Sequence, residues 1–459
     1  MTGAAAPGQE APRGGFDTRD IPASGGGSPG TSEKAFNLPE LTITAPPLVH
    51  ETQITPYGTR IDVVQKDQVQ EMNAHDIADA LRRVPGVGMS RFNLVGAYGG
   101  GAGGSVSVRG HGWGRPGSEI STMVDGIPRF NGVWSHPLLD TLSVDIAERI
   151  EVRKSPDPVF SGSIAFATVN LVPKRASREG YHGRFTTTYG SHDTWTAIGE
   201  HSGKRDKFDY YVLGSHRQSA GHRTDSEGQV DALYGLLGYT FSDRVDMTLL
   251  LNHTESWAND PRAEDAPPVG HTERYNTDSE FYVLTLRHRT DALRGHLKLY
   301  YEDGWAEWEQ NDDQGTPGVG DDTRFSHFPE HDNYGIHAQE TLVPWEDGRL
   351  VLGYDWDTIT GKARDVLPGG AVRNELSRQE LRRSSPYAML AHTFGEAVTV
   401  TPSAGVRWTD TRYFGRDWSY QAGCVAACAN TEFYVNMARS RNYPGIYTAA
   451  EMNLPAKSP

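Results

Sequence analysis

The chain has 459 residues and a formal net charge of -15 at pH 7. This length exceeds one ordinary soluble domain and predicts either two folding units or one large β-architecture. The acidic balance argues against a general nucleic-acid binder, which normally carries a basic face. Hydrophobic residues make up only 37% of the chain and glycine occupies 51 positions, a mixture that favours strands and turns over helices.

Membrane and targeting segments narrow the class further. No segment approaches the ~20 consecutive apolar residues of a membrane-spanning helix, so a helical membrane protein is excluded. A transmembrane β-strand alternates lipid-facing and lumen-facing residues, so modest hydropathy is compatible with a β-barrel. The first residues lack the charged-then-apolar run of a secretory signal. We therefore expect the amino terminus to be incomplete or misassigned.

The amino-terminal region predicts a tether followed by a short extended segment. Residues 1–37 are rich in Gly, Pro, Ala and Ser and show no hydrophobic periodicity, which is typical of disorder. Residues 38–45 form a β-prone run that Pro46 and Pro47 close. An extended run of this kind suits strand addition to a partner protein.

The next part of the chain predicts an α+β domain. A strand is expected at residues 60–64 and a helix at 76–84, where apolar residues recur on one helical stripe. Pro85 and Gly86 are expected to end this helix. Further strand candidates, each bounded by Gly or Pro, lie at 104–109, 120–124 and 149–152.

Beyond about residue 180 the hydrophobic pattern changes to a period of two. It is clearest at residues 296–302 and 350–357, and about a dozen strands are expected in all. The other segments centre near Phe185, Thr196, Tyr210, Leu237, Leu249, Leu284, His337, Leu390, Val400 and Tyr434.

The connections between these strands alternate in length. Short turns lie at 242–244 and 346–348, and long polar loops are expected at 254–275, 308–330 and 364–380. This alternation favours an antiparallel transmembrane β-barrel, while a soluble β-sandwich remains the alternative.

The two cysteines, Cys424 and Cys428, lie in a polar stretch between strand-like segments. No further Cys or nearby His completes a zinc set, so a small loop disulfide between them is the prediction. The histidines do not form a His-Glu-x-x-His spacing. The acidic loop containing Asp312, Asp313, Asp321 and Asp322 lacks the ligand alternation of a calcium loop. No metal site and no cofactor are therefore expected.

Five motifs in order resemble the plug domain of TonB-dependent receptors. They are the helix and stop at 80–87, the strand and glycine at 105–110, the strand and Asp-Gly turn at 122–128, and two closing strands at 147–154 and 170–175. The resemblance implies an α+β plug domain followed by an antiparallel transmembrane β-barrel, which has 22 strands in the family. It divides the chain into a disordered segment at 1–37, a TonB-box-like segment at 38–50, a plug at 51–176 and a carboxyl-terminally incomplete barrel at 177–459.

The plug motifs contain residues with expected structural roles. Asp125-Gly126 is expected to reverse the chain between two strands, and Gly86 and Gly110 to relieve the backbone where a β-carbon would obstruct it. Charged residues are expected to pair within the plug or against the barrel wall. The full structural set is Pro85, Gly86, Arg109, Gly110, Asp125, Gly126, Glu148, Arg149 and Glu151.

The resemblance implies energy-coupled uptake across the bacterial outer membrane. It identifies a TonB box that TonB, with its inner-membrane energy-transducing complex, grips by strand addition: Leu38, Pro39, Glu40, Leu41, Thr42, Ile43, Thr44 and Ala45. Arg and aromatic side chains at the plug apex suit an anionic, ring-bearing chelate such as a ferric siderophore. The expected ligand contacts are Arg91, Phe92, Tyr98, His111, Trp113, Arg129, Phe130, Trp134 and His136.

Length is the main departure from the family, because only about 280 residues follow the plug motifs where a 22-stranded barrel needs on the order of 400. A truncated remnant that does not transport, a passive porin and a soluble β-rich binding protein are therefore the alternatives. An enzyme is not expected, since the chain lacks a Gly-x-Ser-x-Gly elbow, a Walker loop and a zincin motif. Outer-membrane lipid is an expected partner and nucleic acid is not.

Overall fold

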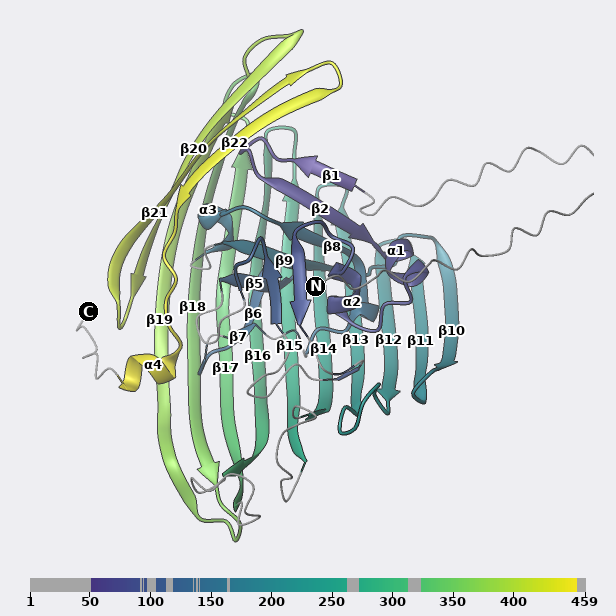
Figure 1. Ribbon diagram of the computed structural model, residues 1–459. Helices are drawn as coiled ribbons and strands as arrows, with labels where there is room; N and C mark the ends of the chain where they lie inside the picture. The colour runs from purple at the N-terminus through teal and green to yellow at the C-terminus, as the bar shows by residue number, and fades with distance from the viewer. Residues whose placement is uncertain are drawn as a thin grey trace, which may run out of the picture. The chain divides into compact units, whose positions relative to one another are not determined.

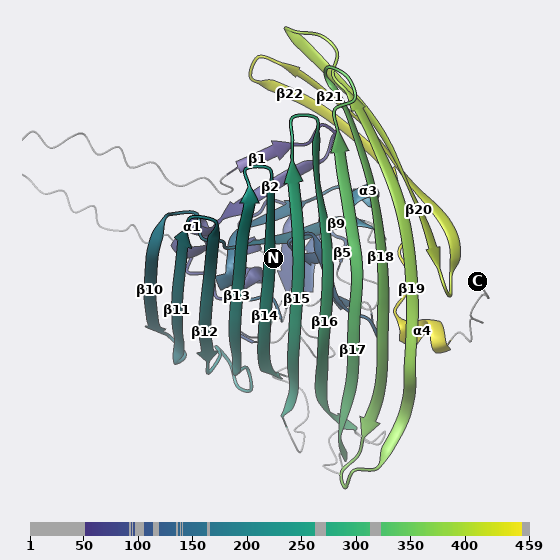
Figure 2. The same cartoon turned by 180° about the vertical axis from the view of Figure 1, so that it is seen from behind.

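The computed structural model describes residues 51–90, 93, 95–96, 105–112, 119–134, 136–137, 139, 141–162, 166–261, 272–312 and 323–451. These residues all belong to one compact unit, which spans 47–459. Within it, short elements of the first third of the chain lie on one side of a large curved sheet (Figure 1). Seen from behind, the large sheet stands in front of those elements (Figure 2).

The first part is built on a seven-stranded mixed sheet with the order β1-β2-β8-β9-β5-β6-β7 and a separate β3-β4 hairpin. Its strands are β1 (Glu51–Ile54), β2 (Arg60–Gln65), β3 (Val87–Ser90), β4 (Ser105–Val108), β5 (Ile120–Val124), β6 (Ile127–Asn131), β7 (His136–Pro137), β8 (Ala147–Arg153) and β9 (Ala167–Pro173). Its helices are α1 (Lys66–Glu71), α2 (Ile77–Leu81), η1 (Val144–Ile146) and α3 (Pro158–Ser161). The α+β organisation is the one that the motifs predict.

Helix α2 shows how local sequence sets an element. Asp76 precedes it in an extended conformation, and its side chain accepts a hydrogen bond from the backbone N–H of Asp79 at 2.7 Å. Ile77 and Leu81 lie one turn apart and are both buried. The helix ends at Leu81, three residues earlier than the prediction.

The second part is a thirteen-stranded antiparallel sheet in which every strand pairs with its neighbours in sequence, from β10 to β22. The strands are β10 (Gly180–Gly190), β11 (Thr194–Arg205), β12 (Phe208–Ser219), β13 (Gly228–Ser242), β14 (Val245–Asp260), β15 (Glu273–Arg289), β16 (Leu293–Asp312), β17 (Thr323–Leu342), β18 (Gly348–Val366), β19 (Val372–His392), β20 (Val398–Thr411), β21 (Gly415–Cys428) and β22 (Thr431–Arg439). Helix α4 (Ile446–Glu451) follows.

Twelve of these strands are those that the alternating pattern predicts, and β21 is the one that the prediction missed. The expected long loops need correction. Much of 254–275, 308–330 and 364–380 is strand, because β14 to β19 continue well past their apolar segments. Polar residues in these extensions still complete backbone ladders, so polarity alone did not mark loops.

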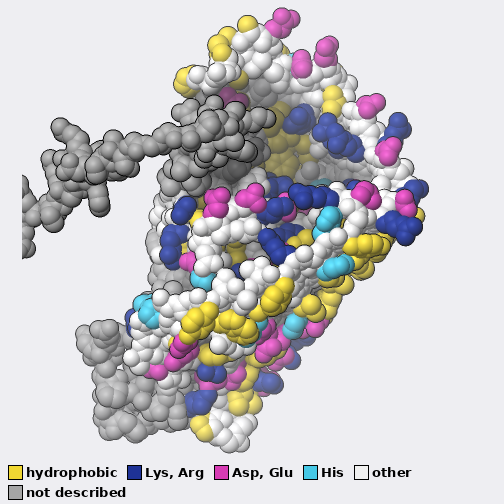
Figure 3. All heavy atoms as spheres, turned by 90° about the vertical axis from the view of Figure 1, so that its right-hand side faces the viewer, with side chains coloured by type: hydrophobic (Ala, Val, Ile, Leu, Met, Phe, Trp, Pro, Cys, Tyr) yellow, Lys and Arg dark blue, Asp and Glu magenta, His cyan; other side chains and the backbone are white. Residues whose placement is uncertain are grey.

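The two faces of the large sheet carry opposite kinds of side chain. On β16, Leu297, Leu299 and Tyr301 are about 40% exposed on the outer face, whereas Lys298 and Glu302 on the other face are buried against the plug. Viewed from the side of β10, hydrophobic side chains form an oblique band with charged side chains on either side (Figure 3). Among the described residues, no helix is long and apolar enough to cross a membrane.

The main apolar core lies inside the first part and continues onto the inner face of the sheet. Val64, Leu81 and Ile150 are buried in the same cluster as Leu213 and Phe281 of the large sheet. A smaller cluster joins Val159 of α3 to β18 and β19. The two parts are therefore packed together, although most inner-face positions of the sheet are polar.

Candidate functional site

The Asp125-Gly126 turn between β5 and β6 touches the inner face of the large sheet. Its φ values are positive at both positions, 50° at Asp125 and 78° at Gly126, as a two-residue hairpin turn requires. The Asp125 carboxylate accepts a hydrogen bond from Lys298 Nζ at 2.8 Å and lies 3.3 Å from the Arg287 guanidinium. The predicted turn is present, and it is also anchored to β15 and β16.

The charge environment keeps this carboxylate ionised. Burial by itself raises the pKa of Asp125, but the Lys298 and Arg287 cations lower it, so that it lies below its ordinary value. The same two effects act on Asp62. Burial raises its pKa, but Lys154 and Arg60 lower it more, so that the pKa lies below its ordinary value. Both carboxylates therefore contribute attraction that acidification would remove.

Arg129 of β6 is enclosed completely between the plug sheet and the large sheet. Its Nε donates to Glu302 Oε1 at 2.6 Å and its Nη2 donates to Ser279 Oγ at 2.8 Å. Its Cζ lies 4.2 Å from the centre of the Phe281 ring. Neither side chain of the Arg129–Glu302 pair has exposed surface. The expectation that Arg129 contacts a ligand is therefore wrong for this arrangement, because its guanidinium is committed to the interface.

Further ion pairs join the first part of the chain to β11, β12 and β14 of the large sheet. They are Asp145 with Arg217 at 2.6 Å, Lys174 with Glu200 at 2.5 Å, and Arg175 with both Asp209 at 2.7 Å and Asp246 at 2.8 Å. Buried charges tolerate few alternative positions, since an unpaired one is costly. This row of pairs therefore fixes the orientation of the plug on the sheet.

The predicted structural charges on the plug surface pair locally. Lys66 Nζ lies 2.6 Å from Glu148, and Arg149 lies 2.7 Å from Glu151. These groups are largely half-exposed, so their contribution to stability is small. Arg109 is exposed with φ 52°, and within the described part of the chain it forms no ion pair.

The role expected for two glycines needs correction. A β-carbon at Gly110 would meet nothing within 4 Å, and at Gly86 it would meet only the Arg109 side chain at 3.8 Å. The φ angle is 80° at Gly86 and 85° at Gly110. Glycine therefore suits both positions because of the positive φ and not because a β-carbon would clash. The Gly86 carbonyl accepts from the Arg109 N–H at 2.8 Å, and the Pro85 carbonyl accepts from Lys154 Nζ at 2.7 Å.

Only part of the expected ligand surface can be located. Arg91, Phe92, Tyr98 and Trp113 lie outside the described residues, as does the whole expected TonB box at 38–45. His136 lies in β7, where the backbone alone is described.

The three remaining expected ligand residues fall into two places. His111 is exposed, stacks on Phe166 with ring centres 3.8 Å apart, and lies 3.2 Å from Glu119. Phe130 and Trp134 are half-buried beside the segment that follows β22. The ring centres of Trp134 and Tyr447 lie 4.2 Å apart, and the two rings are tilted by 31°. The structure thus groups Phe130 with Trp134.

The segment around α4 is an unexpected part of this region. The N–H groups of Ile446 and Tyr447 donate to the carbonyls of Gly132 and Val133 at 3.2 and 3.0 Å. Ile446 is only 2% exposed. Distance along the chain hid this contact, because more than 300 residues separate its two sides.

A small cavity lies between the plug and the wall next to this segment. It is lined by Phe130, Phe160, His337, Arg383, Arg407 and Tyr443 and has a volume of about 40 Å³. That volume suits about one water molecule.

The predicted disulfide is wrong. Cys424 and Cys428 are free thiols in one continuous strand, β21. Four residues of extended chain span about 13 Å, whereas bridged cysteines need Cα atoms within about 7 Å. The stretch taken for a loop is a strand, which holds the two thiols apart.

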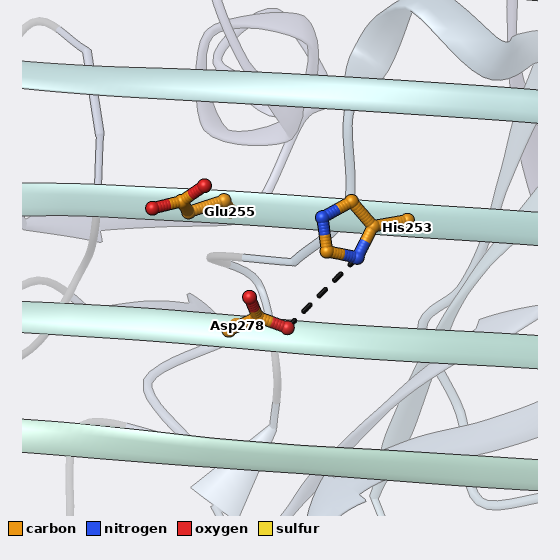
Figure 4. A group of neighbouring side chains, drawn as sticks. All are labelled: His253, Glu255 and Asp278. Atoms are coloured by element: carbon orange, nitrogen blue, oxygen red, sulfur yellow. Dashed lines mark ion pairs between the residues drawn. The ribbon is translucent and has the colours of Figure 1, made fainter.

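His253, Glu255 and Asp278 form a group of potential metal ligands that sequence reasoning missed (Figure 4). One ligand atom from each lies within 4.8 Å of the others, and His253 Nδ1 is 3.9 Å from Asp278. His253 and Glu255 alternate on β14, and Asp278 pairs with Glu255 across the strands. Strand alternation combined with this register was the available signal. The group faces away from the plug, so it lies outside the enclosed region.

Comparison with known proteins agrees with the plug motifs. Residues 56–169 match the TonB-dependent Receptor Plug Domain family. Over 107 residues the chain is 34% identical to the vitamin B12 transporter BtuB of Vibrio vulnificus strain CMCP6. That match covers 23% of this chain and 16% of the transporter.

Solved receptors share the fold across most of the chain. The copper transporter OprC superposes with a TM-score of 0.69 at 15% identity, covering 88% of this chain and 66% of that one. The ferripyoverdine receptor of the Pseudomonas aeruginosa outer membrane gives 0.68 at 13% identity, with 85% and 59% covered. The alcaligin receptor FauA of Bordetella pertussis gives 0.58 at 16% identity, with 84% and 65% covered. The chain therefore spans less than two thirds of each of these receptors.

An α+β domain seated by ion pairs on the polar face of a large up-and-down antiparallel sheet is the architecture of a plugged β-barrel. Residues 56–169 thus match the plug domain of TonB-dependent receptors, and the thirteen-stranded sheet has the fold of part of the barrel of such receptors.

Proposed function

We propose that this chain acts in the bacterial outer membrane as a TonB-dependent receptor for energy-coupled uptake of a metal chelate, with a ferric siderophore as the ligand class. The observation that carries the proposal is the plug itself. It is fixed by buried ion pairs such as Arg129–Glu302 on the polar face of the large sheet.

The outer face of the sheet supports insertion in a membrane. Leu249, Leu284, Leu299 and Ile336 occupy one cross-strand row, and Tyr282, Tyr301 and Tyr334 occupy the adjacent row. Apolar rows bordered by aromatic residues are the pattern of a lipid-facing barrel surface. In a soluble protein the same rows would be an exposed apolar patch. This observation favours the membrane receptor over a soluble β-rich binding protein.

The proposed energy input enters through residues 38–45. This segment precedes β1, which lies at the edge of the plug sheet and, among the described strands, pairs with β2 alone. TonB, coupled to its inner-membrane complex, would bind residues 38–45 by strand addition and pull on the plug. Within the proposal, residues 1–37 form the tether, 38–50 the box, 51–176 the plug and 177–459 the barrel part.

The proposed ligand surface consists of the plug loops and their surroundings. It includes Arg91, Phe92, Tyr98, His111, Trp113, Phe130, Trp134 and His136, and no longer includes Arg129. Aromatic faces and cationic groups suit an anionic chelate. Ferripyoverdine and alcaligin receptors among the structural relatives support a siderophore, while a copper transporter and a vitamin B12 transporter define the competing ligands.

The test expresses the chain in a bacterium that lacks its own siderophore receptors. We expect the chain in the outer-membrane fraction and uptake of radioactive ferric siderophore that disappears when residues 38–45 are deleted or TonB is removed. Cyanocobalamin and copper serve as competing substrates. Insertion without uptake would support a non-transporting remnant, and uptake that survives loss of TonB would support a passive porin. Recovery in the soluble fraction would contradict the membrane assignment.

A further inference from the structure

A cavity of about 510 Å³ lies at the short-turn end of the large sheet. Its lining comes from the end of the plug at Arg175, the β13–β14 turn, and the adjoining ends of β15, β16 and β17. The cavity is large enough for a small organic ligand.

The cavity lining has more basic than acidic residues, whereas the chain as a whole is acidic. The chain carries 59 acidic and 44 basic residues. The cavity lining instead contains five arginines and only two aspartates: Arg175, Arg244, Arg287, Arg289 and Arg294 against Asp243 and Asp246. A local excess of cations in a recess concentrates anions.

The arginines divide into paired and available groups. Arg175 and Arg287 share Asp246, at 2.8 and 3.5 Å, and also pair with Asp209 and Asp125. Across the described ranges, Arg244, Arg289 and Arg294 form no ion pair, and Arg289 lies opposite Arg294 across β15 and β16. Their guanidiniums are therefore available to an incoming anion.

The strand alternation excludes membrane lipid as the occupant. Arg294, His296 and Lys298 alternate along β16 and therefore share one face of the strand. This is the plug-facing side, because Lys298 is buried there against Asp125. Arg289 lies two residues beyond Arg287 on the same side of β15. The cavity thus opens into the enclosed side of the sheet, which a small solute can reach and a lipid headgroup cannot.

We propose that this cavity is an exit-side anion site that takes small ligands bearing several carboxylates or phosphates. Arg289 and Arg294 supply its available cations, and Arg175 and Arg287 border it. A bound anion would compete with Asp125 and Asp246 for the bordering arginines, and so would be favoured when the plug shifts. The name exit side rests on the proposed transport function, whereas the proposal that the cavity binds anions does not.

The test measures citrate binding to the purified chain in detergent by isothermal titration calorimetry at low salt. We expect saturable binding that the double variant R289Q/R294Q weakens at least tenfold and that R289K/R294K largely retains. The matched control is R205Q/K207Q, which removes two positive charges from the neighbouring β11–β12 turn and should shift the affinity less than twofold.

Three outcomes would overturn the proposal. They are the absence of saturable citrate binding, equal weakening by R205Q/K207Q, and binding of an acidic peptide without binding of citrate. Near-ultraviolet circular dichroism checks that each variant is folded. The citrate assay needs no transport. Citrate binding without siderophore uptake would contradict the proposed function and leave the anion site. Siderophore uptake without citrate binding would contradict the anion site and leave the proposed function.

Discussion

The plug sheet and the large sheet bury opposite kinds of side chain. Inside the plug, Val124, Ile127 and Ile150 are apolar and have no exposed surface. On the plug-facing side of the large sheet, Thr254, Glu302 and Asp357 are equally buried but polar. The plug thus has an apolar core of its own, whereas the plug-facing side of the sheet is mostly polar and adds only a few apolar side chains, such as Leu213 and Phe281, to that core. This difference lets the plug keep its own fold while its contact with the large sheet depends largely on polar side chains.

The largest expected effect concerns the ionic contact between the two regions. Arg129→Ala leaves Glu302 buried without its cation, which should destabilise the chain by about 3–5 kcal/mol. Thermal or denaturant unfolding in detergent would measure the loss. The double variant R129M/E302L removes both charges and should recover most of it. If the double variant is as unstable as the single one, packing and not charge holds the contact.

The next effect tests the outer face. Leu299→Arg places a charge in the apolar row and should cost about 2–4 kcal/mol in a bilayer. Asp303→Arg on the same face of the same strand lies beyond Tyr301 and should change stability little. Folding yield in liposomes against denaturant would compare them. Equal tolerance of both variants would contradict a lipid-facing surface.

A smaller effect concerns the Asp125 anchor and its pH dependence. Asp125→Asn should cost about 2 kcal/mol, because the hydrogen bonds to charged groups weaken. The folded pKa of Asp125 lies below its ordinary value. Its contribution is therefore complete above the unfolded pKa of about 3.9 and is lost as the pH falls through the lower, folded value.

Protease sensitivity of the plug between neutral and strongly acidic pH would report this loss. The wild-type chain should open in acid, and the Asp125→Asn chain should already be looser at neutral pH and change less. Asp206→Asn, at an exposed turn, is the control. An identical pH profile for wild type and Asp125→Asn would show that the anchor does not hold the plug.

The last prediction is that the two cysteines contribute nothing measurable to stability. Because Cys424 and Cys428 are free in β21, reduction with dithiothreitol or replacement of both by serine should leave the unfolding temperature unchanged. Loss of a native disulfide would cost about 2–5 kcal/mol. A clear drop on reduction, or a bridged peptide in mass spectrometry, would contradict the structure.

Sequence reasoning captured the fold because its signals are local. Ordered motifs indicated the plug, and period-two alternation located every strand of the large sheet except β21. That strand contains the run Ala422-Gly-Cys-Val-Ala-Ala-Cys428, whose small side chains hide the alternation. Polar strand extensions were likewise taken for loops, since their residues face water or other polar groups and do not alternate in hydropathy.

The site was less predictable because its contacts are distant in sequence. Asp125 was identified as a turn residue, but its partner Lys298 is 173 residues away. The same separation divides Arg129 from Glu302. Such pairs depend on how the plug is rotated within the sheet, which no local pattern encodes. Arg129 was consequently assigned to the ligand, although its fully buried position gives it an interface role.

The order of strands in the plug sheet also determines how it responds to force. Strand β1 is at the edge, and its first residue, Glu51, pairs with Val63 near the end of β2. Tension applied at Glu51 therefore opens the β1–β2 ladder from its free end, one rung after another. Each released residue adds up to about 3.3–3.6 Å of slack. Strands β5 and β6, which hold the Asp125 and Arg129 anchors, lie at the opposite side of the sheet, so a pull unravels the plug before it loads those anchors.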